Sequence, residues 1–172
     1  SWIERKLFLK VNAEKSKIVR PMQSQFLGFA FWKDKETWKC KPVKDRIQRL
    51  YSKVKEITCR KRAVAKTMAV TFTKLNQVIR GWINYFRIGS MKGQMKLFGE
   101  WMRHKVRVVV IKQWKNGATI YRNLQKLNKL FKCNIVDEDI YKVANSRLGW
   151  YKRSNGDVVN YLISPEVLAK KP

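Results

Sequence analysis

Apolar residues recur every three or four positions in three long segments of the chain, residues 43–57, 70–88 and 91–114. This spacing places them on one side of a helix, so each segment is predicted to be an amphipathic helix with one buried face. Short connections join the three segments, which favours a helical bundle. The predicted buried faces comprise Val43, Ile47, Leu50, Val54 and Ile57 in the first helix, Phe72, Leu75, Ile79, Trp82 and Phe86 in the second, and Met95, Phe98, Met102, Val106 and Val109 in the third.

The residues before the bundle have a different pattern. Residues 2–11 have helical spacing and are predicted to be the end of a helix. Aromatic and β-branched residues then favour two short strands, one at Ile18-Val19 and one at residues 25–32. The second strand is predicted to turn at residues 33–36 and to return through residues 37–40.

The residues after the bundle predict smaller elements. Residues 119–131 are predicted to be a shorter helix, and the carboxylates at 137–139 are predicted to begin another, because negative charge is favourable at a helix N-terminus. Residues 156–172 are predicted to be a strand or loop in which Pro165-Glu166 begins a last helical turn. The fold class is therefore mostly α, with a small N-terminal β piece (1–40), a basic three-helix bundle (41–116) and a short α or irregular C-terminal extension (117–172).

The charge of the chain limits the classes of partner that it can have. Lys and Arg number 39 against 12 Asp and Glu, a net charge of +27 on 172 residues, while 45% hydrophobic and 12% aromatic content excludes a disordered basic tail. So large an excess predicts a polyanionic partner, with nucleic acid as the first expectation. The longest apolar run, Val108–Ile111, is far shorter than the roughly 20 residues of a membrane span, so no membrane partner is expected. Residues 1–5 have no signal-peptide layout, which favours a cytoplasmic (bacterial) or organellar location.

Few residues of the chain are suited to catalysis. His104 is the single histidine, and the one cluster of carboxylates, at 137–139, is interpreted as helix capping and not as a metal site. The glycines stand apart and form no phosphate-binding loop. We therefore expect no catalytic residue, no metal and no cofactor on this chain.

The outward faces of the helices are suited to binding RNA. Gln77, Arg80, Asn84 and Arg87 form a row of amide and guanidinium groups along one face of the second helix. Tyr51, Trp150 and Tyr151 lie beside basic residues, where unpaired bases could stack on their rings. Gly81 lies inside the second helix, where it costs about 1 kcal/mol against Ala, and a close helix crossing is predicted to explain it. The predicted RNA-binding residues are Lys17, Arg20, Arg46, Arg49, Lys53, Arg60, Lys61, Arg62, Gln77, Arg80, Asn84, Arg87, Arg103, Arg107, Lys112 and Lys115.

Three segments together resemble one known family. Residues 12–19, Asn-Ala-Glu-Lys-Ser-Lys-Ile-Val, followed by Phe26-Leu27-Gly28-Phe29, look like the end of the palm of a group II intron reverse transcriptase. Residues 75–86 are similar to the L-N-x-x-[IL]-R-G-W-x-N-Y-[FY] signature of that family's maturase domain. Residues 112–115 resemble its W-K-Q-W-K element, with Ile111 in place of the first Trp.

The resemblance implies a role for each part of the chain. Phe26, Leu27, Gly28 and Phe29 would form the primer grip, and Lys15 would lie near the incoming nucleotide. The bundle would be the thumb, or domain X, and the last segment a C-terminal maturase extension. The abrupt helical start is consistent with a truncated chain, and the resemblance implies that the family's catalytic aspartates lie upstream of it. These aspartates form the polymerase site, so Mg²⁺ is expected only there.

The implied partners are structured intron RNA, an RNA/DNA template–primer duplex and the upstream fingers–palm region of the same protein. The implied function is RNA binding for intron splicing and for RNA-directed DNA synthesis by a retroelement. Two alternatives stay open at the level of sequence. One is a stand-alone splicing maturase without a polymerase, and the other is the thumb of a related reverse transcriptase used in CRISPR spacer acquisition or phage defence.

Overall fold

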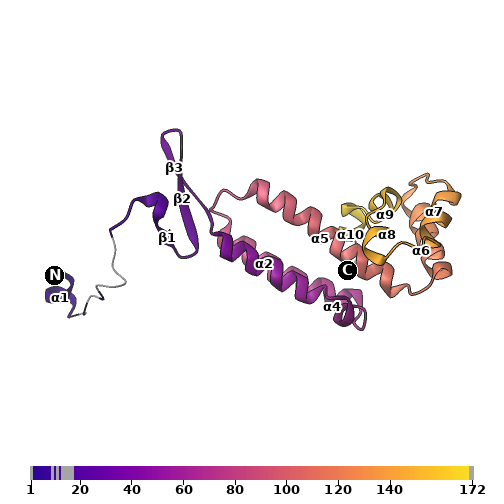
Figure 1. The fold of residues 1–172 in the computed structure, drawn as a ribbon, viewed down its shortest axis with the longest axis horizontal. Coiled ribbons are helices and arrows are strands. Elements are labelled where there is room, and N and C mark those ends of the chain that lie inside the picture. The colour runs from indigo at the N-terminus through magenta and orange to yellow at the C-terminus, as the bar shows by residue number, and fades with distance from the viewer. Residues whose placement is uncertain (1, 9, 11, 13–17, 171–172) are drawn as a thin grey trace.

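The computed structural model describes residues 2–8, 10, 12 and 18–170. Three long helices, α2 (Lys44–Ile57), α4 (Met68–Phe86) and α5 (Lys92–Gln113), form the predicted bundle, and a short helix α3 (Arg60–Ala63) connects the first two. Figure 1 shows this bundle between an N-terminal β piece and a group of C-terminal helices. The mostly α fold with a small sheet is thus confirmed.

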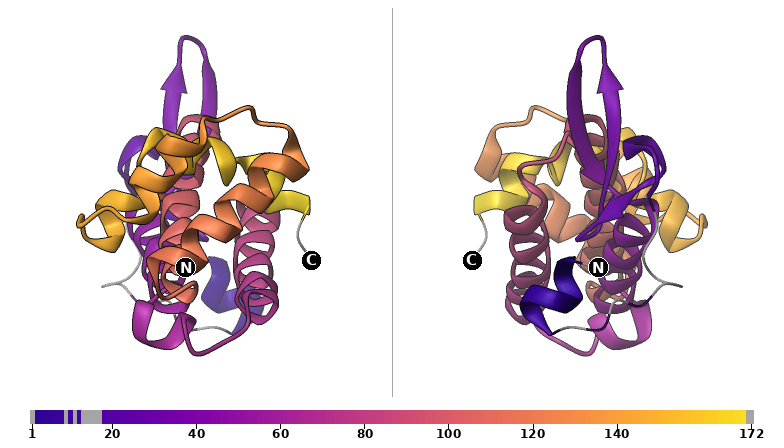
Figure 2. Two further views of the ribbon diagram at one scale, coloured as in Figure 1. Left: turned by 90° about the vertical axis from the view of Figure 1, so that its right-hand side faces the viewer. Right: turned by 90° about the vertical axis from the view of Figure 1, so that its left-hand side faces the viewer.

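The N-terminal piece is an antiparallel sheet in the order β1 (Gln25–Phe26), β2 (Phe29–Asp34) and β3 (Thr37–Pro42). A helix α1 (Trp2–Leu7) and a 3-10 turn η1 (Pro21–Gln23) precede it. The β2–β3 hairpin projects beyond the helices in both end-on views of Figure 2.

The predicted strand at Ile18-Val19 is wrong, since both residues are exposed and lie outside the sheet. Pro21 explains this difference. It lacks an N–H group for a ladder and begins η1, which separates these residues from β1.

The bundle core confirms the predicted apolar faces. Its buried residues are Leu50, Val54, Leu75, Phe98 and Val106. The predicted positions Ile57, Phe72, Ile79, Trp82, Met95 and Met102 pack around them, whereas Phe86 and Val109 are buried outside this cluster. Trp82 is only half-buried: its Nε1 donates to the carbonyl oxygen of Arg46 at 3.3 Å.

The C-terminal extension has a core of its own, which the sequence did not predict. It contains α6 (Gly117–Phe131), α7 (Asp137–Ala144), α8 (Trp150–Arg153), α9 (Asp157–Leu162) and α10 (Pro165–Lys170). The prediction of a strand or loop after residue 156 is wrong for α9, although the helical turn at Pro165 is confirmed. Helices α9 and α10 have six residues each, too few to show a helical period. Burial of Val159, Leu162, Ile163 and Val167 in the core holds them in place.

Arg107 joins the bundle to this extension. It was expected to be displayed to RNA, but its side chain is buried. Its Nε donates to the carbonyl oxygen of Ile163 at 2.9 Å and its Nη1 to Oδ1 of Asn160 at 2.7 Å. Burial, and then repulsion by Arg103, lower the pKa of the Arg107 guanidinium. The physical reason is that the C-terminal end of α9 lies against α5. Carbonyl and amide oxygens at this end accept hydrogen bonds from the guanidinium where the bundle and the extension meet.

Among the described residues, no helix is both long and apolar enough to cross a membrane. Within the same part of the chain, no group of three or more His, Cys, Asp or Glu side chains is close enough to hold a metal ion.

Candidate nucleic-acid interface

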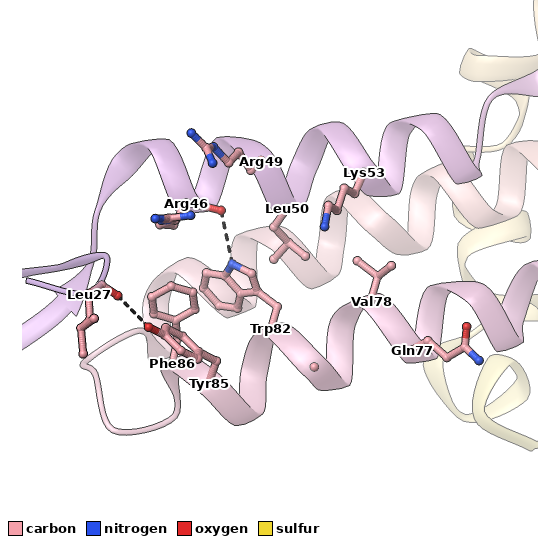
Figure 3. A pocket seen from close by; sticks show the side chains of 11 residues that line it. Leu27, Arg46, Arg49, Leu50, Lys53, Gln77, Val78, Trp82, Tyr85 and Phe86 are labelled. Carbon is pink, nitrogen blue, oxygen red and sulfur yellow. Dashed lines mark hydrogen bonds between the residues drawn. The ribbon is translucent and has the colours of Figure 1, made fainter.

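A groove of about 550 Å³ runs between α2 and α4, as Figure 3 shows. Basic side chains of α2 form one rim, and Gln77 of α4 lies on the other. The floor between the rims is largely apolar and aromatic. The residues that define this α2–α4 groove are Arg46, Arg49 and Lys53 on the rim and Leu50, Val78, Trp82 and Phe86 on the floor.

The groove continues toward α3 through a second hollow of about 350 Å³. Lys53 and Val78 line both parts, so the two hollows adjoin, and we call them together the channel. Arg62, Lys66 and Lys74 add further cations to it. Glu56 is the one acidic side chain among the described residues that line the channel, and it is paired with Arg62 at 2.8 Å. The channel is therefore strongly basic along its length.

The turn between β1 and β2 closes the other end of the groove. Leu27 and Gly28 both have positive φ, 50° and 84°, as a two-residue turn of type I′ requires. A side chain at Gly28 would also meet Arg46, whose Nε lies 3.0 Å from the position of an added Cβ. Glycine adopts this backbone conformation without strain, and any larger residue would also force the Arg46 side chain to shift.

Main-chain and aromatic contacts hold the turn against the bundle. The Val43 N–H donates to the carbonyl oxygen of Gly28 at 3.0 Å, and the Tyr85 hydroxyl donates to that of Leu27, also at 3.0 Å. The ring of Phe29 packs on that of Phe86, with 5.0 Å between centroids. The primer-grip-like segment is thus placed at the end of the basic groove.

Gly81 lies in the floor of the α2–α4 groove. The predicted close helix crossing at this position is wrong, because a Cβ added to Gly81 would have no heavy atom within 4 Å. Nothing in the described part of the chain packs against this point of α4. The glycine instead leaves the helix backbone open to the groove.

The predicted polar row on α4 does not face a single site. Gln77 lines the α2–α4 groove, whereas Arg80 lines a separate hollow of about 480 Å³ between α4, α5 and α10, together with Arg103. Asn84 and Arg87 are exposed and line neither hollow. The row is therefore a ridge between two hollows.

The other predicted binding residues are dispersed. On α3, Arg62 faces the channel, whereas Arg60 lies at a different hollow, where α2 meets α5 and α8. Arg20, Lys61 and Lys115 are exposed and Lys112 is half-buried. Lys15 and Lys17 lie outside the described residues.

Sequence reasoning missed two cations of the channel, Lys66 and Lys74. Lys74 precedes Val78 by four residues and so lies on the same face of α4, a spacing that would have identified it. Lys66 lies in the connection before α4, where no periodic pattern indicates a direction.

These features define a basic helical module whose main groove has a cationic rim, an apolar floor and an open helix backbone. Residues 47–128 match the family model of the group II intron, maturase-specific domain. The match begins in α2 and ends in α6, so it includes most of the groove. Residues 47–128 therefore carry a group II intron maturase-specific domain. The comparison with curated proteins gives no match.

Proposed function

We propose that this chain is the RNA-binding part of a group II intron reverse transcriptase/maturase, and that the α2–α4 groove holds the nucleic acid. It binds structured intron RNA for splicing and grips the template–primer duplex during RNA-directed DNA synthesis. Polymerase chemistry, with its Mg²⁺, belongs to the fingers–palm region of the same protein. The match to the maturase-specific domain and the basic channel support this proposal.

The lining of the groove is suited to a sugar–phosphate strand. Arg46, Arg49 and Lys53 can neutralise phosphates, and the release of condensed counterions then drives binding. The floor formed by Leu50, Val78 and Trp82 offers apolar surface to ribose and base edges. Such contacts position a strand without reading its sequence.

The single observation that carries the proposal is the empty space above Gly81. A glycine in a helix interior costs about 1 kcal/mol relative to Ala, and the surrounding structure gives no packing reason for it. A ligand strand that approaches the helix backbone at this point accounts for the glycine, because any larger side chain would occupy the strand's place.

The test compares a helical glycine that lines the groove with one that does not: Gly81 in the interior of α4 and Gly93 at the second position of α5. Gly81 and Gly93 both lie in helices, and a Cβ at either position would have no heavy atom within 4 Å, but only Gly81 lines the groove. Gly81→Leu should leave the chain at least as stable while weakening RNA binding at least about tenfold, or about 1.4 kcal/mol. Gly93→Leu should leave binding unchanged.

Two probes separate the two parts of the proposed function: a transcript of a group II intron and a short RNA/DNA hybrid. Both should bind, with affinities that fall steeply as salt rises. Binding of the intron transcript alone would favour the stand-alone splicing maturase. Equal loss of affinity in the Gly81 and Gly93 variants, or no loss in either, would remove the groove from the RNA-binding surface.

A further inference from the structure

We propose a second RNA-binding site, separate from the groove, at the place where α2, α5 and α8 meet. A hollow of about 340 Å³ lies there, and we call it the α5–α8 hollow. Three of its lining residues are the cations Lys55, Arg60 and Lys105, and among the described residues that line it none is acidic. The others are Thr58, Cys59, Val108 and Tyr151.

This hollow and the groove lie on opposite sides of α2. Lys53 lines the groove and Lys55 lines the hollow. Two residues correspond to a rotation of about 200° around an α-helix, so the two lysines project in nearly opposite directions. A nucleic acid in the groove therefore leaves the α5–α8 hollow accessible.

Contacts within the protein hold the aromatic wall of the hollow in place. The His104 Nε2 lies 2.9 Å from the carbonyl oxygen of Tyr151, and the two rings are 4.1 Å apart between centroids. The Lys105 ammonium lies over the Tyr151 ring at 5.1 Å and over the Trp101 ring at 5.8 Å. Aromatic faces thus position this lysine beside the hollow.

The chemistry of the hollow matches an RNA backbone. Ammonium and guanidinium groups donate to phosphate oxygens, and the Tyr151 side chain, 51% exposed, offers a surface against which a base can stack. A free phosphate would use the cations but would leave the aromatic wall unused. The C-terminal extension would thus take part in RNA binding, because Tyr151 belongs to α8.

With sites on two sides of α2, one molecule can hold two RNA segments together. Occupation of the first site raises the local concentration of RNA at the second, which adds avidity without any new contact. The bridging role rests on the proposed RNA binding of the groove, whereas RNA binding at the hollow itself does not, since the variants of the two sites share no residue.

The first experiment measures bridging. One RNA hairpin is immobilised, the protein is added, and capture of a second, labelled RNA hairpin is followed. The unaltered chain should capture the second RNA. A variant with Lys55→Gln, Arg60→Gln and Lys105→Gln should lose most of this capture while it still binds the immobilised RNA through the groove.

The matched control removes the same charge elsewhere, by Lys33→Gln, Lys41→Gln and Lys92→Gln, which are exposed and line neither hollow. This control should retain capture. Equal capture by the hollow variant and the unaltered chain would overturn the proposal, as would an equal loss in the control.

The second experiment needs no substitution in the hollow. The thiol of Cys59 is exposed and lines it, so RNA bound there should slow alkylation of Cys59 several-fold. The half-buried Cys40 and Cys133 serve as internal references. Gly81→Leu separates the two sites: alkylation of Cys59 should remain RNA-sensitive in that variant. An alkylation rate that saturating RNA does not change would overturn the second site and leave the groove unaffected.

Discussion

The Tyr85 hydroxyl of α4 donates a hydrogen bond to the carbonyl oxygen of Leu27 in the β1–β2 turn, 58 residues earlier in the chain, at 3.0 Å. Figure 3 shows both side chains at the end of the groove. The bond joins the primer-grip-like turn to the helix that carries the maturase signature. Two segments that the sequence assigns to separate domains thus meet at one site.

Tyr85→Phe removes this hydrogen bond and keeps the ring. Because Tyr85 is 53% exposed, unfolding free energy should fall by only about 0.5–1 kcal/mol, while the turn becomes more mobile. Hydrogen exchange of the Gly28 and Phe29 amides should accelerate. Tyr161→Phe, at another exposed tyrosine, is the control and should change neither quantity. Unchanged exchange in the Tyr85 variant would show that the bond does not hold the turn.

Arg107→Met tests the structural role of the buried guanidinium. The variant keeps an aliphatic side chain but leaves the Ile163 carbonyl oxygen and the Asn160 amide oxygen without their donor. We expect a loss of about 2–4 kcal/mol in urea unfolding. The control Arg122→Met, at an exposed position of α6, should have little effect on stability. A stable Arg107 variant that loses RNA affinity would instead restore the binding role expected from the sequence.

Asp137 should make stability depend on acid pH. Its carboxylate accepts from the Tyr121 hydroxyl and, at 2.6 Å, from Gln125, and these bonds in that order lower the pKa of Asp137. A carboxylate with a lowered folded pKa stabilises the protein above its unfolded pKa, and this contribution disappears as pH falls through the folded pKa. Asp137→Asn should therefore reduce stability at neutral pH and flatten the acid side of the pH–stability curve.

The hydrogen bond between Tyr121 and Asp137 should also make the protein less stable at alkaline pH. The hydrogen bond to Asp137, and then burial, raise the pKa of Tyr121, so its contribution is complete below the unfolded pKa and is lost as pH rises through the folded pKa. Tyr121→Phe should remove this alkaline dependence. Thermal unfolding across pH measures both effects, and curves parallel to that of the unaltered chain would contradict the assignment.

Arg80→Glu with Arg87→Glu should weaken RNA binding and flatten its salt dependence. Both side chains are exposed on the ridge of α4, where reversed charges repel phosphates, and fewer counterions are released on binding. Because Arg87 is the C-cap of α4, a small loss of stability, about 0.3–1 kcal/mol, should accompany the change. Filter binding over a salt series gives the slope. The same reversal at Arg122 and Arg147 is the control, and equal effects would show that net charge alone matters.

The sequence predicted the helices of the bundle because their apolar periods are long and regular. It failed where contacts distant in the chain decide the outcome. The apolar period of α5 correctly places Arg107 outside the apolar face of the bundle. The C-terminal extension packs over Arg107, however, and no local sequence pattern predicts this contact. At Gly81 the sequence indicated an unusual residue but not whether a helix or open space lies above it.

The candidate site was predictable in part for the same reason. Arg46, Arg49 and Lys53 recur at helical spacing on α2 and do share one rim. The division of the α4 row between two hollows depends on how α10 packs against α4 and α5, which involves residues far from the row. The match at residues 47–128 agrees with the resemblance and leaves the roles of single residues as predictions.

Helix α5 belongs to both cores: Phe98 and Val106 pack in the bundle, and Ile111 packs in the extension. A helix without a break fixes the phase between its two ends. Inserting one residue between Val106 and Ile111 would turn the extension by about 100° relative to the bundle and shift it by about 1.5 Å. The length of α5 therefore sets the angle between the bundle and the extension.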